Sequence, residues 1–173
     1  MKVVSINTVC NGSTGKIVGS ISSSLIESGE EAFCIFGRRK GYANIPCKKI
    51  GGFFSFWYHV FLTTVFDLHG HGSYFKTKKI VRELKKLNPD IIHLHNIHGY
   101  YINYKVLFDY LKNEFQGRVF WTLHDCLPMT GHCAYFSNVS CEKWKNGCHD
   151  CPNKKMYPTS LIFDRSRKNY QEK

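Results

Sequence analysis

The sequence predicts an α/β fold, in which a parallel β-sheet carries helices on its faces. Short β-rich runs alternate with segments whose apolar residues recur at helical spacing, and the alternation occurs twice, over residues 2–36 and 90–123. Of the 173 residues, 43% are hydrophobic and 21% are charged, an ordinary balance for a globular chain. Because strand–helix–strand units favour parallel sheets, we expect one domain with a buried core.

The individual elements follow from periodicity and from turn residues. Four runs are predicted strands: residues 2–7, 32–36, 90–95 and 119–123. A polar, glycine-bearing loop, Asn11–Lys16, follows the first strand. Five segments are predicted helices: residues 17–28, 53–66, 73–88, 106–111 and 160–173. Residues 41–72 leave the number of further strands open at one or two.

The charge balance points to an anionic partner. Lys and Arg number 24 against 13 Asp and Glu, which gives a net charge of +11. This balance favours nucleic acid, phosphorylated ligands or an anionic membrane surface, without choosing among them. No segment has the roughly 18 apolar residues that would span a membrane. The aromatic run 53–66, preceded by Lys48 and Lys49, would suit peripheral contact with an anionic membrane.

The chain has eight cysteines, and five of them lie in a long irregular segment, residues 126–158. No signal peptide is visible after Met1, so we expect a cytoplasmic chain with reduced thiols. Clustered cysteines there are typical of metal ligands. The pair in Cys148–Cys151 has the C-x-x-C spacing of half a tetrahedral zinc site, and Cys133 and Cys141 could complete it.

A structural zinc is therefore predicted on Cys133, Cys141, Cys148 and Cys151, with disulfides or free thiols as alternatives. His132 and His149 are alternative ligands. The other four cysteines are expected to be small core residues: Cys10, Cys34, Cys47 and Cys126.

The N-terminal loop Gly12–Lys16 could bind an anion, because backbone N–H groups at a helix N-terminus attract phosphate and carboxylate groups. It is not a nucleotide-binding P-loop. Cys10 stands where that motif has a glycine, and Ile17 replaces the Ser or Thr that would hold Mg²⁺. The alternative is a simple helix cap.

Polar residues end two predicted strands. His93, His95 and Asn96 close one, and His124 and Asp125 close another. Alternating side chains place His93 and His95 on one face of the sheet. Because ligands bind at the carboxyl edge of open α/β sheets, these residues are candidates for catalysis or sugar binding. A hydrogen-bonded core histidine is the alternative, above all for His93.

Five stretches together resemble the N-terminal domain of bacterial family 4 glycosyltransferases, of the group that builds capsular, exopolysaccharide or colanic-acid polymers. The stretches are residues 67–73, 89–101, 121–126, 130–133 and 147–152. Asn7 with Gly12–Lys16 resembles the N-terminal loop of that family, so the resemblance covers nearly the whole chain. It implies a Rossmann-like parallel sheet, the N-terminal half of a GT-B fold, with the cysteine-rich loop appended.

The resemblance also implies roles for individual residues. His124 and Asp125 would be catalytic, near the transferred sugar. Gly12, Ser13, Thr14, Gly15, Lys16, His95 and Asn96 would bind substrate. A nucleotide-sugar would be the co-substrate, and a sugar or lipid-linked molecule the acceptor. Such enzymes transfer hexosyl groups with retention and need no catalytic metal.

The sequence, taken as residues 1–173, holds one acceptor-binding domain, and the C-terminal donor domain of the resembled family is absent from it. Because transfer needs donor and acceptor held together, we expect the isolated chain to be inactive unless a donor domain is supplied in cis or in trans. Its place would be the cytoplasm, at the inner face of the cell membrane. One alternative is a non-catalytic remnant or interaction domain. A zinc-bearing nucleic-acid-binding protein is disfavoured, since no C₂H₂ spacing is present.

Overall fold

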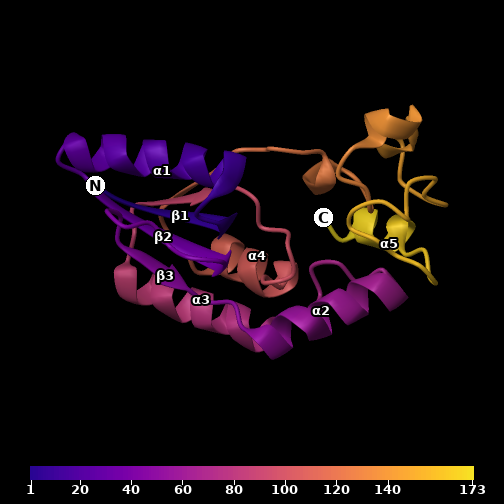
Figure 1. The fold of residues 1–173 in the computed structure, drawn as a ribbon, viewed down its shortest axis with the longest axis horizontal. Coiled ribbons are helices and arrows are strands. Elements are labelled where there is room, and N and C mark those ends of the chain that lie inside the picture. Colours follow the sequence, from indigo (N-terminus) through magenta and orange to yellow (C-terminus); the bar gives the residue numbers. More distant parts are fainter.

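A computed structural model describes residues 1–173 and confirms the α/β fold. Five parallel strands form one sheet in the order β3–β2–β1–β4–β5 (Figure 1). The bounds are β1 (Lys2–Val9), β2 (Glu31–Arg38), β3 (Cys47–Lys49), β4 (Ile91–Leu94) and β5 (Arg118–Trp121). This order is that of Rossmann-like sheets, so the predicted Rossmann-like architecture is confirmed. All four predicted strands are present, and the open middle segment supplies one more, β3.

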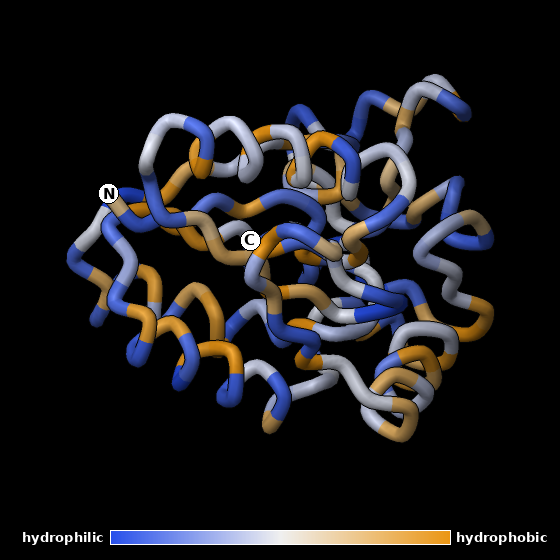
Figure 2. The backbone as a smooth tube through the Cα atoms, turned by 60° about the vertical axis from the view of Figure 1, so that its left-hand side comes forward, coloured by the Kyte–Doolittle hydropathy of each residue, from blue (hydrophilic) through white to orange (hydrophobic).

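The chain forms five α-helices. Their bounds are α1 (Gly12–Glu27), α2 (Phe53–Phe66), α3 (Tyr74–Leu87), α4 (Tyr104–Asn113) and α5 (Ser166–Gln171). Figure 1 shows α1 on one face of the sheet and α3 with α4 on the other. Hydrophilic and hydrophobic stretches alternate along α3 (Figure 2), as expected for a helix with one face on the core and one in solvent. No helix is long and apolar enough to cross a membrane.

The main core is a cluster of 13 buried residues between the sheet and the α3–α4 layer. Ile6 and Ile92 of the central strands meet Ile80 and Leu84 of α3, and all four are fully buried. Central strands that are covered on both faces consist of nearly continuous apolar residues. The sequence predicted these strands well for that reason. Burying each such side chain contributes about 1.5–3 kcal/mol.

Two predicted boundaries are wrong. The expected loop Gly12–Lys16 is the first turn of α1, because a first turn needs no apolar residues and gives no periodic signal. The expected final helix 160–173 shortens to α5. Leu161 and Phe163 instead donate backbone N–H groups to the carbonyl oxygens of Thr64 and Val65 at the end of α2, at 2.8 and 3.2 Å.

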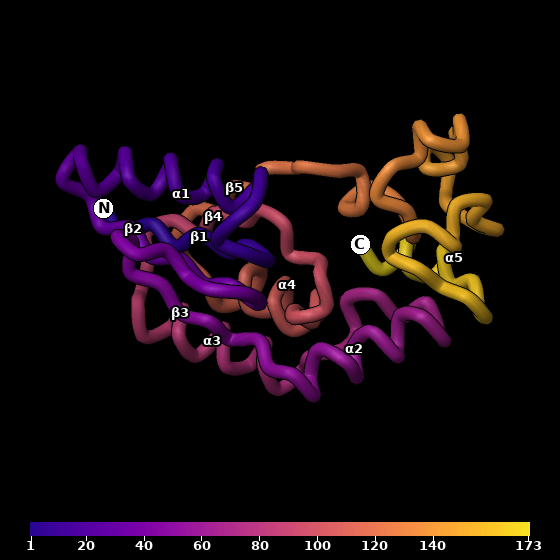
Figure 3. The backbone as a smooth tube through the Cα atoms, viewed as in Figure 1, coloured from indigo at the N-terminus to yellow at the C-terminus, as the bar shows by residue number.

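The segment 126–158 has no strand and no α-helix, in agreement with the predicted irregular loop. Its only regular elements are short 3₁₀-helices: Leu127–Met129, Phe136–Val139 and Lys143–Lys145. Figure 3 shows it, followed by α5, on the side of the molecule away from the N-terminus, with α2 reaching toward it. The C-terminal segment, defined here as residues 126–173, thus forms a second body that packs beside the sheet.

Candidate functional site

The candidate site lies at the carboxyl edge of the sheet, close to where the strand order reverses between β1 and β4. Open α/β sheets bind ligands at such a reversal point. A cavity of about 910 Å³ opens there between the loops after β4 and β5, helix α4 and the C-terminal segment. Its polar lining includes His69, His95, Asn96, His98, His124, Asp125, Arg165 and Lys173.

Two of the predicted strand-end histidines, His95 and His124, meet in the wall of this cavity, and His93 lies behind His95. His93 and His95 share one face of β4 and its extension, with ring centroids 4.0 Å apart. His93 is held by the Thr122 hydroxyl, 2.8 Å from its Nε2. His95 Nδ1 lies 3.1 Å from His124 Nε2, and the two rings stack at 5.4 Å. The sheet therefore pairs two residues that are 29 positions apart in the chain.

This histidine pair offers hydrogen bonds to a ligand. Burial lowers the pKa of His95 to about 3, with smaller effects from His93 and His124, so its ring is neutral at pH 7. The buried Nε2 of His95 has no partner. Whichever ring donates in the His95–His124 contact, two outer nitrogens remain, one a donor and one an acceptor. A sugar hydroxyl can both donate and accept, so the pair is chemically matched to it.

Asp125 forms a chain of hydrogen bonds with His98 and Tyr157. Its Oδ2 lies 2.6 Å from His98 Nε2, and the other ring nitrogen of His98 lies 2.8 Å from the Tyr157 hydroxyl. Burial acts to raise the pKa of Asp125, but the hydrogen bond and charge of His98, with the Leu127 N–H group, hold that pKa below its ordinary value. Asp125 is therefore a fixed carboxylate at the cavity wall. His98 has both nitrogens engaged, so it positions Asp125 and leaves none for a ligand.

His69 is a site residue that sequence reasoning did not assign. The Tyr104 hydroxyl lies 3.1 Å from its Nδ1, while its buried Nε2 has no partner. Burial lowers the pKa of His69 well below its ordinary value. It lies in the turn between α2 and α3, where no periodicity marks it. The run His69–Gly70–His71 was the available signal, and only tertiary structure brings it to the cavity.

The C-terminal segment supplies the opposite wall. Lys173 donates from Nζ to the carbonyl oxygens of Leu127 and Thr130, at 2.6 and 2.7 Å, and burial lowers its pKa to about 8. Glu172 pairs with His71 at 3.0 Å. The cavity is thus enclosed by two bodies distant in sequence, which explains why the sequence alone did not outline it.

The predicted substrate-binding residues divide into two groups. His95 and Asn96 line the cavity, whereas Gly12, Ser13, Thr14, Gly15 and Lys16 do not. The two groups are linked through Asn7, which accepts from the Asn96 N–H group at 3.1 Å and contacts the Thr14 hydroxyl at 3.4 Å. A Cβ on Gly15 would lie 2.5 Å from the Cys10 carbonyl carbon, so that glycine permits close helix–strand packing.

The four cysteines predicted as zinc ligands line one small cavity of about 10 Å³ in the C-terminal segment. All are free thiols, and a hydrogen bond with Cys151 lowers the pKa of Cys133 to about 6. As placed, no three Cys, His, Asp or Glu side chains are grouped closely enough to hold a metal ion. His132 is not oriented as a ligand, because its ring nitrogens contact Asp67 at 2.6 Å and the Lys154 carbonyl oxygen at 3.0 Å.

Of the remaining cysteines, Cys10 and Cys34 are buried in a small core cluster, as predicted. Cys47 packs against that cluster and is partly exposed, as is Cys126. These two predictions therefore hold only in part, because both residues lie where the core meets a surface loop.

Fold and site together define an α/β domain with a histidine-lined cavity at its carboxyl edge. No known family profile matches the chain. The chain is similar to the putative colanic acid biosynthesis glycosyl transferase WcaC of Escherichia coli strain K12, with 35% identity over 78 residues. That stretch is 43% of this chain and 19% of the relative, so the chain matches about a fifth of the relative's length. The predicted resemblance to a colanic-acid-type glycosyltransferase is confirmed; the assignment to family 4 stays a prediction.

Proposed function

We propose that this chain is the acceptor-side domain of a glycosyltransferase that extends a polysaccharide or a lipid-linked sugar. The observation that carries the proposal is the cavity at the carboxyl edge of the sheet, where His69 and His95 each present a buried ring nitrogen without a partner. An unsatisfied buried polar atom costs about 1–3 kcal/mol, so a ligand hydroxyl that satisfies it is favoured. The similarity to WcaC supports the same conclusion.

The proposed chemistry assigns separate tasks to neighbouring side chains. His95 and His124 hold acceptor hydroxyls through their outer nitrogens. Asp125 is a negative charge that acts on His124, and His98 keeps it fixed and ionised. Placed beside the transferred sugar, a fixed carboxylate stabilises positive charge that develops at the anomeric carbon. No metal is required for this step.

The donor would be a nucleotide-sugar, the transferred group a hexosyl unit, and the stereochemical outcome retention, as the family resemblance implies. A donor domain in cis or in trans must close over the acceptor, because the two reactants have to be held in one geometry. We place the domain in the cytoplasm, at the inner face of the membrane. No specific nucleic-acid partner is proposed.

Saccharide binding tests the proposal directly. The chain is labelled at the histidine rings, and a panel of neutral and acidic oligosaccharides is titrated while ring signals are followed by NMR. We expect shifts at His69, His95 and His124. His149 is the internal control, since it is exposed in the cysteine-rich loop. Equal shifts at His149, or no shifts with any saccharide, would contradict the proposal and favour a non-catalytic interaction domain.

Turnover tests the second half of the proposal. The chain alone should transfer no sugar from nucleotide-sugar donors to a lipid-linked acceptor. In an active complex with a donor domain, we expect Asp125→Asn to lower kcat by roughly 100-fold or more, the usual scale for loss of one preorganised charge. His149→Asn should leave kcat unchanged. Robust turnover by the chain alone would contradict the requirement for a donor domain.

We further propose that zinc binds Cys133, Cys141, Cys148 and Cys151 and orders the segment around them. In support, the four thiols line one cavity, and the lowered pKa of Cys133 favours its thiolate. Zinc ligands must be thiolates about 2.3 Å from the metal, so binding would draw these sulfur atoms closer together. The role would be structural, since a closed four-cysteine site leaves no position for a substrate.

A further inference from the structure

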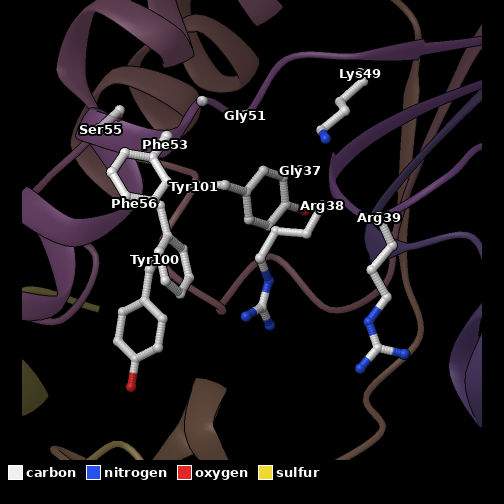
Figure 4. Close-up of a pocket in the computed structure, with 11 residues that line it drawn as sticks. Gly37, Arg38, Arg39, Lys49, Gly51, Phe53, Ser55, Phe56, Tyr100 and Tyr101 are labelled. Carbon is white, nitrogen blue, oxygen red and sulfur yellow. The ribbon is translucent and has the colours of Figure 1, made fainter.

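A second pocket lies at the same edge of the sheet, on the other side of β1. It has a volume of about 240 Å³ and is formed by the ends of β2 and β3, the start of α2 and the loop after β4. Figure 4 shows Arg38, Arg39 and Lys49 on one side of it and the rings of Phe53, Phe56 and Tyr100 on the other. None of its lining residues is acidic.

The cations of this pocket are not neutralised by their surroundings. Arg38 lies with its guanidinium over the Phe56 ring, 5.2 Å from the centroid, and its buried Nε has no hydrogen-bond partner. Arg39 makes one long contact, 3.4 Å, to the side-chain oxygen of Asn11. Arg38 is partly buried, and Arg39 and Lys49 are exposed, so the three cations are open to an anion from outside the chain.

Two glycines that line the pocket are packed closely against other parts of the chain. A Cβ on Gly37 would lie 2.4 Å from the Tyr101 ring, and one on Gly51 would lie 1.8 Å from the Gly37 carbonyl oxygen. Each position is therefore restricted to glycine. This close packing holds in place the backbone that carries the cations.

Helix α2, which borders the pocket, buries polar side chains and exposes most of its aromatic ones. Its polar side chains face inward: the ring of His59 lies 3.0 Å from both the Ser73 hydroxyl and the Gly70 N–H group, and Thr63 is fully buried. Its aromatic side chains face outward, with Phe54 87% and Trp57 54% exposed. The helix contains no charged residue. A soluble surface helix normally has the opposite arrangement.

The apolar surface extends beyond α2. Phe66, the last residue of α2, stacks on Phe163 of the C-terminal segment with ring centroids 5.6 Å apart. Leu161 and Ile162 are 59% and 61% exposed beside it. At the other end, exposed basic residues of α3 continue the surface: Lys78, Lys79, Arg82, Lys85 and Lys86. We call α2 with residues 161–163 the aromatic surface.

We propose that the pocket of Arg38, Arg39 and Lys49 binds the phosphate group of an anionic lipid, while the aromatic surface lies in the bilayer interface beside it. Charge complementarity selects this occupant. Exposed Phe and Trp next to unpaired cations suit the boundary where acyl chains meet phosphate groups. Each Lys or Arg near an anionic membrane contributes about 1 kcal/mol, and the chain carries a net charge of +11.

The inference concerns binding alone, so it does not rest on the proposed sugar transfer. The inference nevertheless places the two binding sites next to each other. The loop after β4 lines both, with His98 in the larger cavity and Tyr100 in the phosphate pocket. A Cβ on Gly99, between them, would lie 3.3 Å from the Arg38 guanidinium. A lipid phosphate held there would leave its attached sugar close to the larger cavity.

Vesicle sedimentation tests the proposal. The intact chain is mixed with vesicles of phosphatidylcholine alone, or of phosphatidylcholine containing phosphatidic acid. We expect binding to the second kind and little to the first. The double variant Arg39→Gln/Lys49→Gln should weaken partitioning about 25-fold, or fivefold for each charge. Arg118→Gln is the matched control, because that exposed arginine lies at the opposite, amino-terminal edge of the sheet.

Two further measurements separate the alternatives. Phe54→Ser/Trp57→Ser, at exposed positions, should abolish vesicle binding while circular dichroism remains unchanged. Inorganic diphosphate should compete only partly, because it lacks the acyl chains. Binding of diphosphate in solution, without any binding to vesicles, would overturn the membrane part and leave a soluble phosphate as ligand. Equal binding by the Arg39→Gln/Lys49→Gln variant and the parent would overturn the pocket. If the parent forms a dimer and does not bind vesicles, and the Phe54→Ser/Trp57→Ser variant is a monomer, the aromatic surface binds a second copy of the chain.

Discussion

The sheet half of this protein and its C-terminal segment are built on different principles. The sheet half has a core of 13 buried residues, and its backbone groups are paired within strands and helices. The C-terminal segment has one short helix, α5, and is attached mainly by polar contacts to residues far away in sequence. Asp67, at the end of α2, is the centre of that attachment. It contacts His132 at 2.6 Å, the Arg165 N–H group at 2.8 Å and the Asn169 side chain at 2.8 Å.

The difference determines how much stability each region loses when one residue is replaced. Apolar burial is distributed over many residues, so one substitution in the sheet half removes a fraction of its stability. A buried polar centre concentrates its contribution in a few atoms, and removing one partner leaves the others unsatisfied. The candidate cavity lies between the two regions, so any weakening of the attachment should also disturb the site.

The largest expected effect is that of zinc removal on the C-terminal segment. We expect one zinc ion per chain, and its removal by a chelator should unfold this segment while the sheet half persists. The reason is that structural zinc supplies most of the folding free energy of a segment that lacks an apolar core. Trp144, which stacks on Phe136 at 4.8 Å, reports on the segment when Trp57 and Trp121 are replaced by Phe.

Cys148→Ser should abolish zinc binding, and Cys47→Ser, outside the cluster, should not change it. Metal analysis of the purified chain checks both variants. If the purified chain contains no zinc and its Trp144 fluorescence does not change with a chelator, zinc does not stabilise the C-terminal segment.

Next in size is the effect of Asp67→Ala. It should lower the free energy of unfolding of the C-terminal segment by about 3–5 kcal/mol, because His132 is left buried without its carboxylate. Urea titration followed at Trp144 and, separately, at Trp121 measures the two regions. The control is Asp109→Ala, whose exposed pair with Lys105 contributes at most about 1 kcal/mol. Equal loss in both regions would show that they unfold as one unit.

The smallest of the three effects is acid sensitivity of the sheet half. Burial lowers the pKa of His59 to about 4 and that of His95 to about 3, against 6.5 for an ordinary histidine. Below pH 6.5 the unfolded chain therefore binds more protons than the folded one, so stability falls as the pH falls. At up to about 1.4 kcal/mol per pH unit for each histidine, the loss from pH 6.5 to about pH 5 is roughly 3 kcal/mol.

Urea titration at several pH values, with Trp121 as reporter in a Trp144→Phe background, measures this slope. His149→Asn is the control, since that exposed ring lies outside the sheet half. A sheet half whose stability is level over this range would mean that the two buried rings are protonated without cost.

Periodicity and turn residues in the sequence determined much of this protein. They predicted the four main strands, the helical segments, the irregular cysteine-rich loop and the pairing of His93 with His95 on one face. Each of these depends on residues close together in the chain, whose side-chain directions are fixed by backbone geometry. His124 was expected at the same edge because carboxyl ends of parallel strands meet there.

The tertiary structure decided the rest. Only chain folding brings Tyr157 and Asp125 to His98, or brings His69, whose Nε2 has no partner, to the wall of the same cavity. Helix α2 shows the limit most clearly. Its composition is largely apolar, yet its inward face is occupied by the polar contacts of His59, and most of its aromatic rings remain outside. Which face of a helix is buried depends on what the neighbouring elements offer it, and that information lies in contacts distant along the chain rather than in local spacing.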